Sequence, residues 1–178
     1  MSKEMPASDA HSIGVIVRDA TVDDRDFVIT TAVRLAEFGP PPWRTPNEIV
    51  TREQQALKDF FDRPVSGTAL LIAGRPDGKQ LGYVYLETHR DYFTAEQLAH
   101  VSTLAISESV EGTGVGSALM RAAEEWARAK GYQGLTLNVF EGNIRAREIY
   151  EHLGFRVETL HYVKALDGQS KTTCDPES

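Results

Sequence analysis

Residues 110–117 read Val110-Glu-Gly-Thr-Gly-Val-Gly-Ser117 and join a predicted strand to a predicted amphipathic helix. Glycines allow the backbone to turn tightly and to approach a ligand closely. The free amides and the positive end of the following helix form an anion site that holds phosphate without any lysine. The stretch therefore predicts a phosphate ligand, and a glycine-rich turn that binds nothing is the alternative.

The spacing of this loop disfavours two other kinds of phosphate site. A P-loop needs Lys and then Ser or Thr after its last glycine, whereas Ser117 follows Gly116 directly. A dinucleotide fingerprint would need its third glycine at position 117, and it usually opens its domain, whereas about a hundred residues precede this loop. Neither nucleoside triphosphate hydrolysis nor dinucleotide binding fits the loop well.

The rest of the chain predicts strands alternating with helices. Apolar runs predict strands at 15–18, 68–73, 81–87, 100–106, 135–140 and 155–163, although the alternation in 100–106 is imperfect. Apolar spacing and capping signals predict helices from Thr21 to just before Gly39, and at 45–62, 115–131 and 143–152. A Pro-Asp-Gly turn makes 68–73 and 81–87 a hairpin. The predicted class is α/β, with a mixed, mainly antiparallel sheet flanked by helices.

A second group of signals lies at 143–155. Asn143 begins a helix as its cap, and Tyr150 lies seven residues, about two turns, further on. Gly154 stops that helix, and Phe155 follows it. A capped helix with a core tyrosine would explain either residue alone, but both together, behind the glycine loop, favour a shared site.

These features together resemble the GNAT superfamily of N-acetyltransferases. The resemblance is strongest over 98–163, where a strand, the glycine loop, a helix, a strand, Asn143 to Tyr150 and Leu153-Gly-Phe155 follow in order, and it extends weakly back to residue 15. It implies a GNAT-like fold. It also implies transfer of the acetyl group of acetyl-CoA to a primary amine of a small molecule or peptide, by direct attack in a ternary complex.

The resemblance also implies which residues bind acetyl-CoA. The glycine loop would hold the pyrophosphate, the strand at 104–106 would offer backbone groups to the pantetheine arm and the thioester, and Asn143 would help to hold the arm. The implied set is Leu104, Ala105, Ile106, Glu111, Gly112, Thr113, Gly114, Val115, Gly116, Ser117, Asn143, Ala146 and Tyr150.

Glu111 departs from the family pattern, which prefers Gln or Arg at this position. A carboxylate that faced the pyrophosphate would be repelled, so either its side chain turns to water or the affinity for CoA is lower. A non-catalytic acyl-CoA sensor is therefore the alternative function.

Three residues are candidates for catalysis. The resemblance implies that Tyr150 protonates the departing CoA thiolate. An amine must lose a proton before it attacks, and we expect either His100, at the start of a predicted strand, or Glu87, at the end of another, to accept that proton directly or through water. Histidine suits this role because its ordinary pKa is about 6.5. Either residue could instead be a strand-end side chain with no catalytic part.

Aromatic and basic residues concentrate in the first two predicted helices, in their connecting loop and after Glu87. We expect them to build the acceptor pocket, although each alone fits ordinary packing. These candidates are Phe38, Trp43, Arg44, Tyr92 and Phe93. We predict no metal site.

The composition bears on the number of domains, the partners and the cellular compartment. The chain has 178 residues, with 19 Lys and Arg against 26 Asp and Glu, a formal net charge of −7 and one cysteine. We expect one domain over 13–166 with flexible tails at 1–12 and 167–178. The acidic balance disfavours nucleic acid and anionic membranes as partners, and no apolar run approaches the ~20 residues of a membrane span. The lone Cys174 fits a reducing cytoplasm, and the resemblance allows a homodimer.

Overall fold

The computed structural model describes residues 14–164 and residue 166. These residues form two compact units. The sheet unit comprises residues 14–32 and 53–138, and the α4 unit comprises 33–52 and the described residues from 139 onward. The predicted tails at 1–12 and 167–178, with Cys174, lie outside the described residues, and the single domain over 13–166 stays a prediction.

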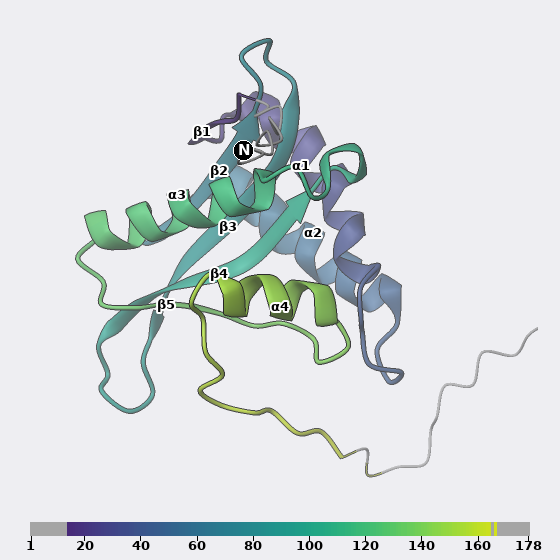
Figure 1. The fold of residues 1–178 in the computed structure, drawn as a ribbon, viewed down its shortest axis with the longest axis vertical. Coiled ribbons are helices and arrows are strands. Elements are labelled where there is room, and N and C mark those ends of the chain that lie inside the picture. Colours follow the sequence, from purple (N-terminus) through teal and green to yellow (C-terminus); the bar gives the residue numbers. More distant parts are fainter. Residues whose placement is uncertain (1–13, 165, 167–178) are drawn as a thin grey trace, which may run out of the picture. The chain divides into compact units, whose positions relative to one another are not determined.

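The sheet unit is built on one five-stranded sheet in the order β1-β2-β3-β4-β5 (Figure 1). The strands are β1 (Ile16–Asp19), β2 (Thr68–Gly74), β3 (Gln80–Arg90), β4 (Gln97–Ile106) and β5 (Leu135–Leu137). Neighbouring strands are antiparallel except β4 and β5, which are parallel. The predicted mixed, mainly antiparallel sheet is confirmed.

The helical segments are η1 (Val22–Asp24), α1 (Arg25–Thr31), η2 (Ala32–Ala36), α2 (Pro46–Asp62), η3 (Glu108–Val110), α3 (Val115–Ala129) and α4 (Ile144–His152). The capping signal before α2 is confirmed: the Thr45 backbone N–H donates to Glu48 Oε2 at 2.9 Å, and the Glu48 N–H donates to Thr45 Oγ1 at 3.2 Å. No helix among the described residues is long and apolar enough to cross a membrane.

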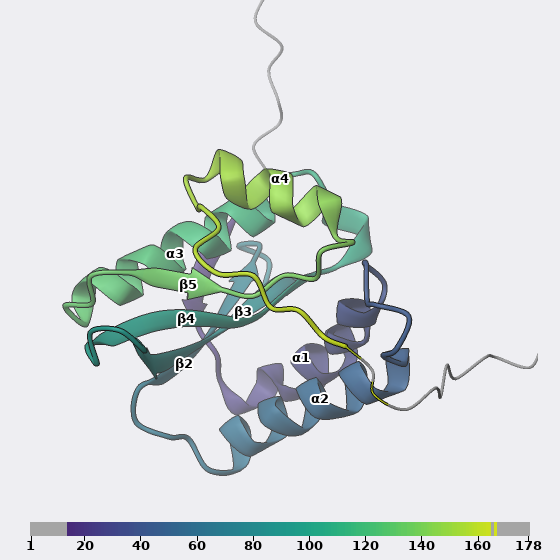
Figure 2. The same ribbon diagram turned by 90° about the horizontal axis from the view of Figure 1, so that it is seen from below.

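Within the sheet unit, α3 covers one face of the sheet, and α1 with residues 53–62 of α2 covers the other (Figure 2). The apolar stripe of α3 is buried against the sheet, with Val115, Leu119 and Ala123 fully enclosed. Val28 of α1 and Leu57 of α2 are equally buried on the opposite side. The spacing of three and four residues that predicted α3 is thus the spacing of its core-facing side chains.

The strand expected at 155–163 is a wrong prediction. None of residues 155–164, all of which the structure describes, lies in a strand. Its large apolar side chains are exposed, with Val157 at 65%, Leu160 at 68% and Tyr162 at 86%. A β-rich composition describes a segment that fits a sheet, but a strand forms only where a partner edge accepts its hydrogen bonds.

Two other elements differ from expectation. The helix expected from Thr21 to just before Gly39 is three short pieces, η1, α1 and η2, and ends at Ala36; 3₁₀ turns at helix ends are common. The strand expected at 135–140 stops at Leu137. The chain then turns, and the Phe140 carbonyl accepts a hydrogen bond from the Asn143 N–H at 3.0 Å.

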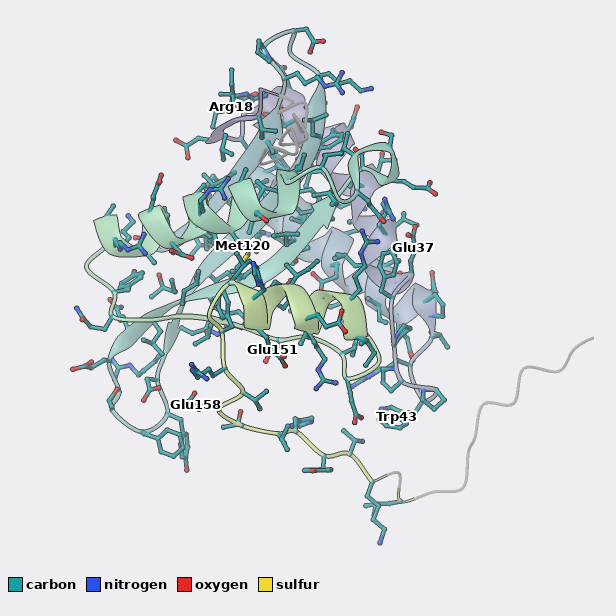
Figure 3. The ribbon with its side chains drawn as sticks, in the orientation of Figure 1. Arg18, Glu37, Trp43, Met120, Glu151 and Glu158 are labelled. Atoms are coloured by element: carbon teal, nitrogen blue, oxygen red, sulfur yellow. The ribbon has the colours of Figure 1, made fainter. Side chains whose placement is uncertain are left out.

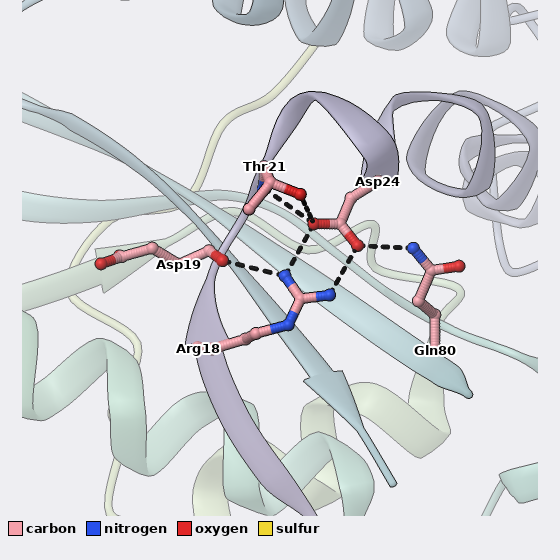
Figure 4. Close-up of polar contacts among 5 residues, drawn as sticks. All are labelled: Arg18, Asp19, Thr21, Asp24 and Gln80. Atoms are coloured by element: carbon pink, nitrogen blue, oxygen red, sulfur yellow. Dashed lines mark hydrogen bonds and ion pairs between the residues drawn. The ribbon is translucent and has the colours of Figure 1, made fainter. Parts of the chain in front are cut away.

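A buried carboxylate joins β1, η1 and β3 (Figure 4). Asp24, only 1% exposed, accepts two hydrogen bonds from the Arg18 guanidinium, at 2.7 and 2.8 Å, and one from the Thr21 N–H at 2.8 Å. The Gln80 amide donates to its other oxygen. The hydrogen bonds from Arg18 hold the pKa of Asp24 well below its usual range. This carboxylate therefore ties η1 to β1 and β3.

We predict that Asp24→Ala lowers the free energy of unfolding by about 2–3 kcal/mol. Breaking a fully buried ion pair costs ~3–5 kcal/mol, but Arg18 is 47% exposed and water compensates part of the loss. Because folding lowers the pKa of Asp24, its contribution is present above about pH 4 and is lost as the pH falls further, so the variant should lose less stability in acid.

Urea unfolding at neutral and acid pH measures both effects. Asp23→Ala, in the same turn but exposed, is the control and should change stability by less than ~0.5 kcal/mol. Equal losses in the two variants would contradict the account.

Candidate functional site

The glycine loop is anchored at its start and requires glycine at two positions. Val110 is 3% exposed, and its carbonyl accepts a hydrogen bond from the Thr113 hydroxyl at 2.6 Å. Gly112 and Gly114 have φ of +73° and +89°, values that residues with a side chain rarely adopt. Gly114 is also the N-cap of α3. The glycines therefore turn the chain sharply from β4 into α3.

The same loop leaves an open cradle above the N-terminus of α3. A Cβ placed on Gly112, Gly114 or Gly116 would have no atom within 4 Å. The first amides of a helix have no partner within it and carry its positive end, and α3 has 15 residues. The predicted binding of the CoA phosphates by this cradle stays a prediction. Glu111 is half-buried at the end of η3, and its effect on CoA affinity stays a prediction.

β4 has an open edge between this loop and the middle of the sheet. Its ladder with β5 covers only Ala99 to Val101. Beyond Val101, no strand among the described residues pairs with the edge of β4 that faced β5, around Leu104 and Ala105. His100 pairs with Thr136 within that short ladder, so it lies next to the point where the two strands separate.

Glu87 and His100 are brought together, though not at strand ends as expected. β3 continues to Arg90 and β4 begins at Gln97, so the two residues face each other as register partners within the β3–β4 pair. Both side chains lie on the sheet face that α1 and α2 cover, the face on which Tyr85 packs against Phe60 of α2 at 5.5 Å.

A β-bulge in β4 explains the imperfect alternation in its sequence. Tyr85 pairs with Thr103 but Leu86 pairs with Val101, which leaves Ser102 as an extra residue. A bulge shifts the alternation by one, so Thr103 and His100 share a face despite their odd spacing. The sequence shows only the broken pattern.

Glu87 is held by several polar neighbours. The Ser102 hydroxyl donates to its Oε2, and the Tyr85 hydroxyl donates to Oε1 at 3.5 Å. His89 Nε2 lies 3.8 Å from Glu87 Oε2. The His89 ring stacks on the His100 ring, with centroids 4.1 Å apart and an interplanar angle of 13°. The two candidate bases therefore belong to one polar cluster.

Burial sets the charge of His100. The side chain is 7% exposed, and this burial lowers the pKa of His100 to about 4, with a further lowering from His89 and an opposing rise from Glu87. His100 is therefore neutral near pH 7 and can accept a proton, but its lowered pKa makes it a weaker base than a free imidazole. Burial likewise raises the pKa of Tyr85 to about 12, so its hydroxyl stays protonated beside Glu87.

The α4 unit holds the second group of predicted site residues. The Asn143 side chain accepts a hydrogen bond from the Ala146 N–H at 3.1 Å, which confirms the predicted cap. Tyr150 packs edge-on against Phe155 at 5.9 Å. Burial raises the pKa of Tyr150, so its phenol keeps its proton at neutral pH. The roles of these residues in binding and catalysis stay predictions.

The five acceptor-site candidates fall into two groups. Phe38, Trp43 and Arg44 belong to the α4 unit, where the Arg34 guanidinium lies 5.7 Å from the Phe38 ring and Trp43 is half exposed (Figure 3). Tyr92 and Phe93 lie in the turn between β3 and β4, pack on each other, and are 92% and 74% exposed. Their part in acceptor binding stays a prediction.

Three polar neighbours of the candidate bases were not predicted from the sequence: His89, Ser102 and Thr136. His89 had a usable signal, because Tyr85, Glu87 and His89 alternate along β3 and so share a face. Thr136 could not be found this way, since its partner lies 36 residues away.

We predict that His100 stays neutral at about pH 5.5, where a free imidazole of pKa ~6.5 is mostly charged. NMR titration of histidine side chains, with His100→Gln to assign the signal, measures this. His89→Gln should raise the pKa of His100, and Glu87→Gln should lower it further. Because folding lowers this pKa, the contribution of His100 to stability is complete above ~pH 6.5 and falls toward pH 4. A titration near 6.5 would contradict the burial argument.

Comparison with known proteins gives a family match over most of this region. The model of the acetyltransferase (GNAT) family matches residues 34–155. A mycothiol acetyltransferase of Stackebrandtia nassauensis is 30% identical over 160 residues, which cover 86% of this chain and 49% of the relative. The chain thus spans about half the length of the curated relatives it matches.

Solved structures share the fold at lower identity. A putative acetyl transferase from Pyrococcus furiosus has a TM-score of 0.70 and 22% identity, covering 85% of this chain and 99% of its own. An aminoglycoside N-acetyltransferase in complex with CoA has a TM-score of 0.62 and 16% identity, covering 86% and 95%. With the match over 34–155, these findings show that the chain belongs to the acetyltransferase (GNAT) family.

Proposed function

We propose that this protein transfers the acetyl group of acetyl-CoA to a primary amine of a small molecule or peptide, by direct attack of the amine in a ternary complex. The observation that carries the proposal is a buried, neutral imidazole beside a carboxylate, at the point where β4 separates from β5 and on the strand that leads to the glycine cradle. Acetyl-CoA is the cosubstrate of the GNAT family.

The chain binds the CoA thioester through backbone groups. The amides of 112–117 hold the pyrophosphate, apart from that of Thr113, which donates to the Val110 carbonyl at 3.3 Å. The backbone of β4 around Leu104–Ile106 offers hydrogen-bonding groups to the extended pantetheine arm. From Ile106 to His100 the ladder with β3 advances five residues, because Ser102 is bulged, which is about 17 Å at ~3.3 Å per residue. An arm laid along this edge from the cradle therefore ends beside His100. The resemblance to the family adds Asn143 and Ala146 as proposed contacts of CoA.

The acceptor amine is activated in the polar cluster. The carboxylate of Glu87 attracts an ammonium group, and the neutral His100 accepts its proton directly or through water, which frees the nitrogen lone pair. Acetyl-CoA supplies an acetyl group activated as a thioester. The C–N bond forms and the C–S bond breaks. Tyr150, protonated at neutral pH, donates a proton to the departing thiolate, and the second proton that the nitrogen loses on becoming an amide restores the phenol through water.

The names of the relatives support a small polar acceptor. One relative is a mycothiol acetyltransferase, and one structural neighbour is an aminoglycoside N-acetyltransferase. The carboxylate in the cluster favours a cationic amine over a neutral one. We therefore place small cationic amines first among the acceptors, with Phe38, Trp43, Arg44, Tyr92 and Phe93 as the contacts that select among them.

A thiol-release assay with acetyl-CoA across a panel of amines tests the function. We expect release with one or more small cationic amines, and we expect His100→Gln to lower kcat by about 10²–10⁴-fold, the usual contribution of a general base. His161→Gln, at an exposed position, is the matched control and should leave kcat unchanged. Binding of acetyl-CoA without release on any amine would favour the sensor instead.

We predict that Gly116→Leu abolishes CoA binding while the protein stays folded. Gly116 has an ordinary φ and open space at its Cβ, so leucine adds no backbone strain but fills the cradle. Arg121→Leu, on the exposed face of α3, is the control. Calorimetry with CoA measures the loss, and circular dichroism checks the fold. A folded Gly116→Leu variant with unchanged affinity would exclude the cradle as the phosphate site.

A further inference from the structure

We propose that Thr136 is a positioning residue that holds the His100 imidazole in the tautomer protonated on Nδ1, so that Nε2 carries the free lone pair. The inference rests on the proposed role of His100 as the base, and it names the atom that accepts the proton.

The geometry places Thr136 directly beside the ring. It is the register partner of His100 in the parallel β4–β5 pair. His100 Nδ1 lies 2.8 Å from Thr136 Oγ1. The same Oγ1 lies 3.2 Å from the carbonyl oxygen of Ala99, to which it donates. One hydroxyl therefore lies between an imidazole nitrogen and a backbone carbonyl.

Counting protons selects the tautomer. A threonine hydroxyl has one hydrogen to donate, whereas a carbonyl oxygen can only accept. When the hydroxyl donates to Ala99, Oγ1 can only accept from Nδ1, so Nδ1 must carry the hydrogen. In the other tautomer the hydroxyl would have to donate to Nδ1, and its bond to Ala99 would be lost. Both hydrogen bonds exist together only when Nδ1 is protonated.

Neighbouring side chains hold the plane of the His100 ring. The ring of His89, on β3, stacks on it with the two centroids 4.1 Å apart, and the His100 side chain is only 7% exposed. In a neutral imidazole with Nδ1 protonated, Nε2 is the basic nitrogen. The hydroxyl on β5 thus decides which nitrogen of the β4 histidine accepts a proton.

The hydroxyl, and not the bulk of the side chain, carries the effect. Valine has nearly the shape of threonine and suits a strand, so Thr136→Val keeps the packing and removes only the hydrogen bonds. Thr136→Ser keeps the hydroxyl and is the rescue variant. Thr68→Val is the matched control. The Thr68 hydroxyl also donates to a carbonyl, that of Val65, and Thr68 lies in β2, which β3 and β4 separate from β5.

The test combines NMR of ¹⁵N-labelled histidine with kinetics. In the wild type, in Thr136→Ser and in Thr68→Val, we expect Nδ1 of His100 to be protonated and Nε2 to be unprotonated. In Thr136→Val we expect a mixture of tautomers. We also expect kcat to fall about tenfold in Thr136→Val, as the loss of one hydrogen bond implies, with the KM for acetyl-CoA unchanged and the rate largely restored in Thr136→Ser.

Two results would overturn the inference. One is a wild-type spectrum with Nε2 protonated, and the other is a Thr136→Val variant with the wild-type tautomer and the wild-type kcat. The His100→Gln variant shows whether the positioning role of Thr136 or the proposed base role of His100 is wrong. If His100→Gln keeps full activity, the proposed base is wrong whatever tautomer the ring adopts.

Discussion

The antiparallel pairing of β3 with β4 is the interaction on which the site depends. These are the two longest strands of the sheet, and their register places Glu87 opposite His100. The bulge at Ser102 turns Thr103 to the same face. The far end of β4 leads through η3 into the glycine loop and α3. One strand pair therefore positions the two candidate bases and leads to the glycine loop.

The electrostatics of the site follow from burial and from backbone dipoles more than from net charge. In the proposed site, backbone amides and a helix end would hold an anionic ligand in place of lysines, although the chain has a net charge of −7. Net charge does not decide the charge of His100 either. Burial and the neighbouring His89 lower its pKa more than Glu87 raises it, so the imidazole is neutral. Asp24 shows the opposite case, because Arg18 keeps a buried carboxylate charged.

Local signals in the sequence predicted most of the fold. Capping at Thr45 and Asn143, the apolar stripe of α3 and the hairpin between β2 and β3 all depend on residues close in the chain. The prediction of a strand at 155–163 is wrong because a strand needs a pairing partner, and composition does not show whether one is present. The candidate site could be predicted only in part. Glu87 and His100 are candidates from the sequence, but their pairing, the bulge and the contact with Thr136 depend on the register between strands distant in the chain.

A crystal structure with CoA and an acceptor amine tests the central claim most directly. The account predicts that the pyrophosphate accepts hydrogen bonds from the amides of residues 112–117, that the pantetheine arm pairs with β4 around Leu104–Ile106, and that the amine nitrogen lies beside His100 and Glu87 on the α1/α2 face of the sheet. A pyrophosphate bound away from the glycine loop, or an amine bound on the face that α3 covers, would contradict it.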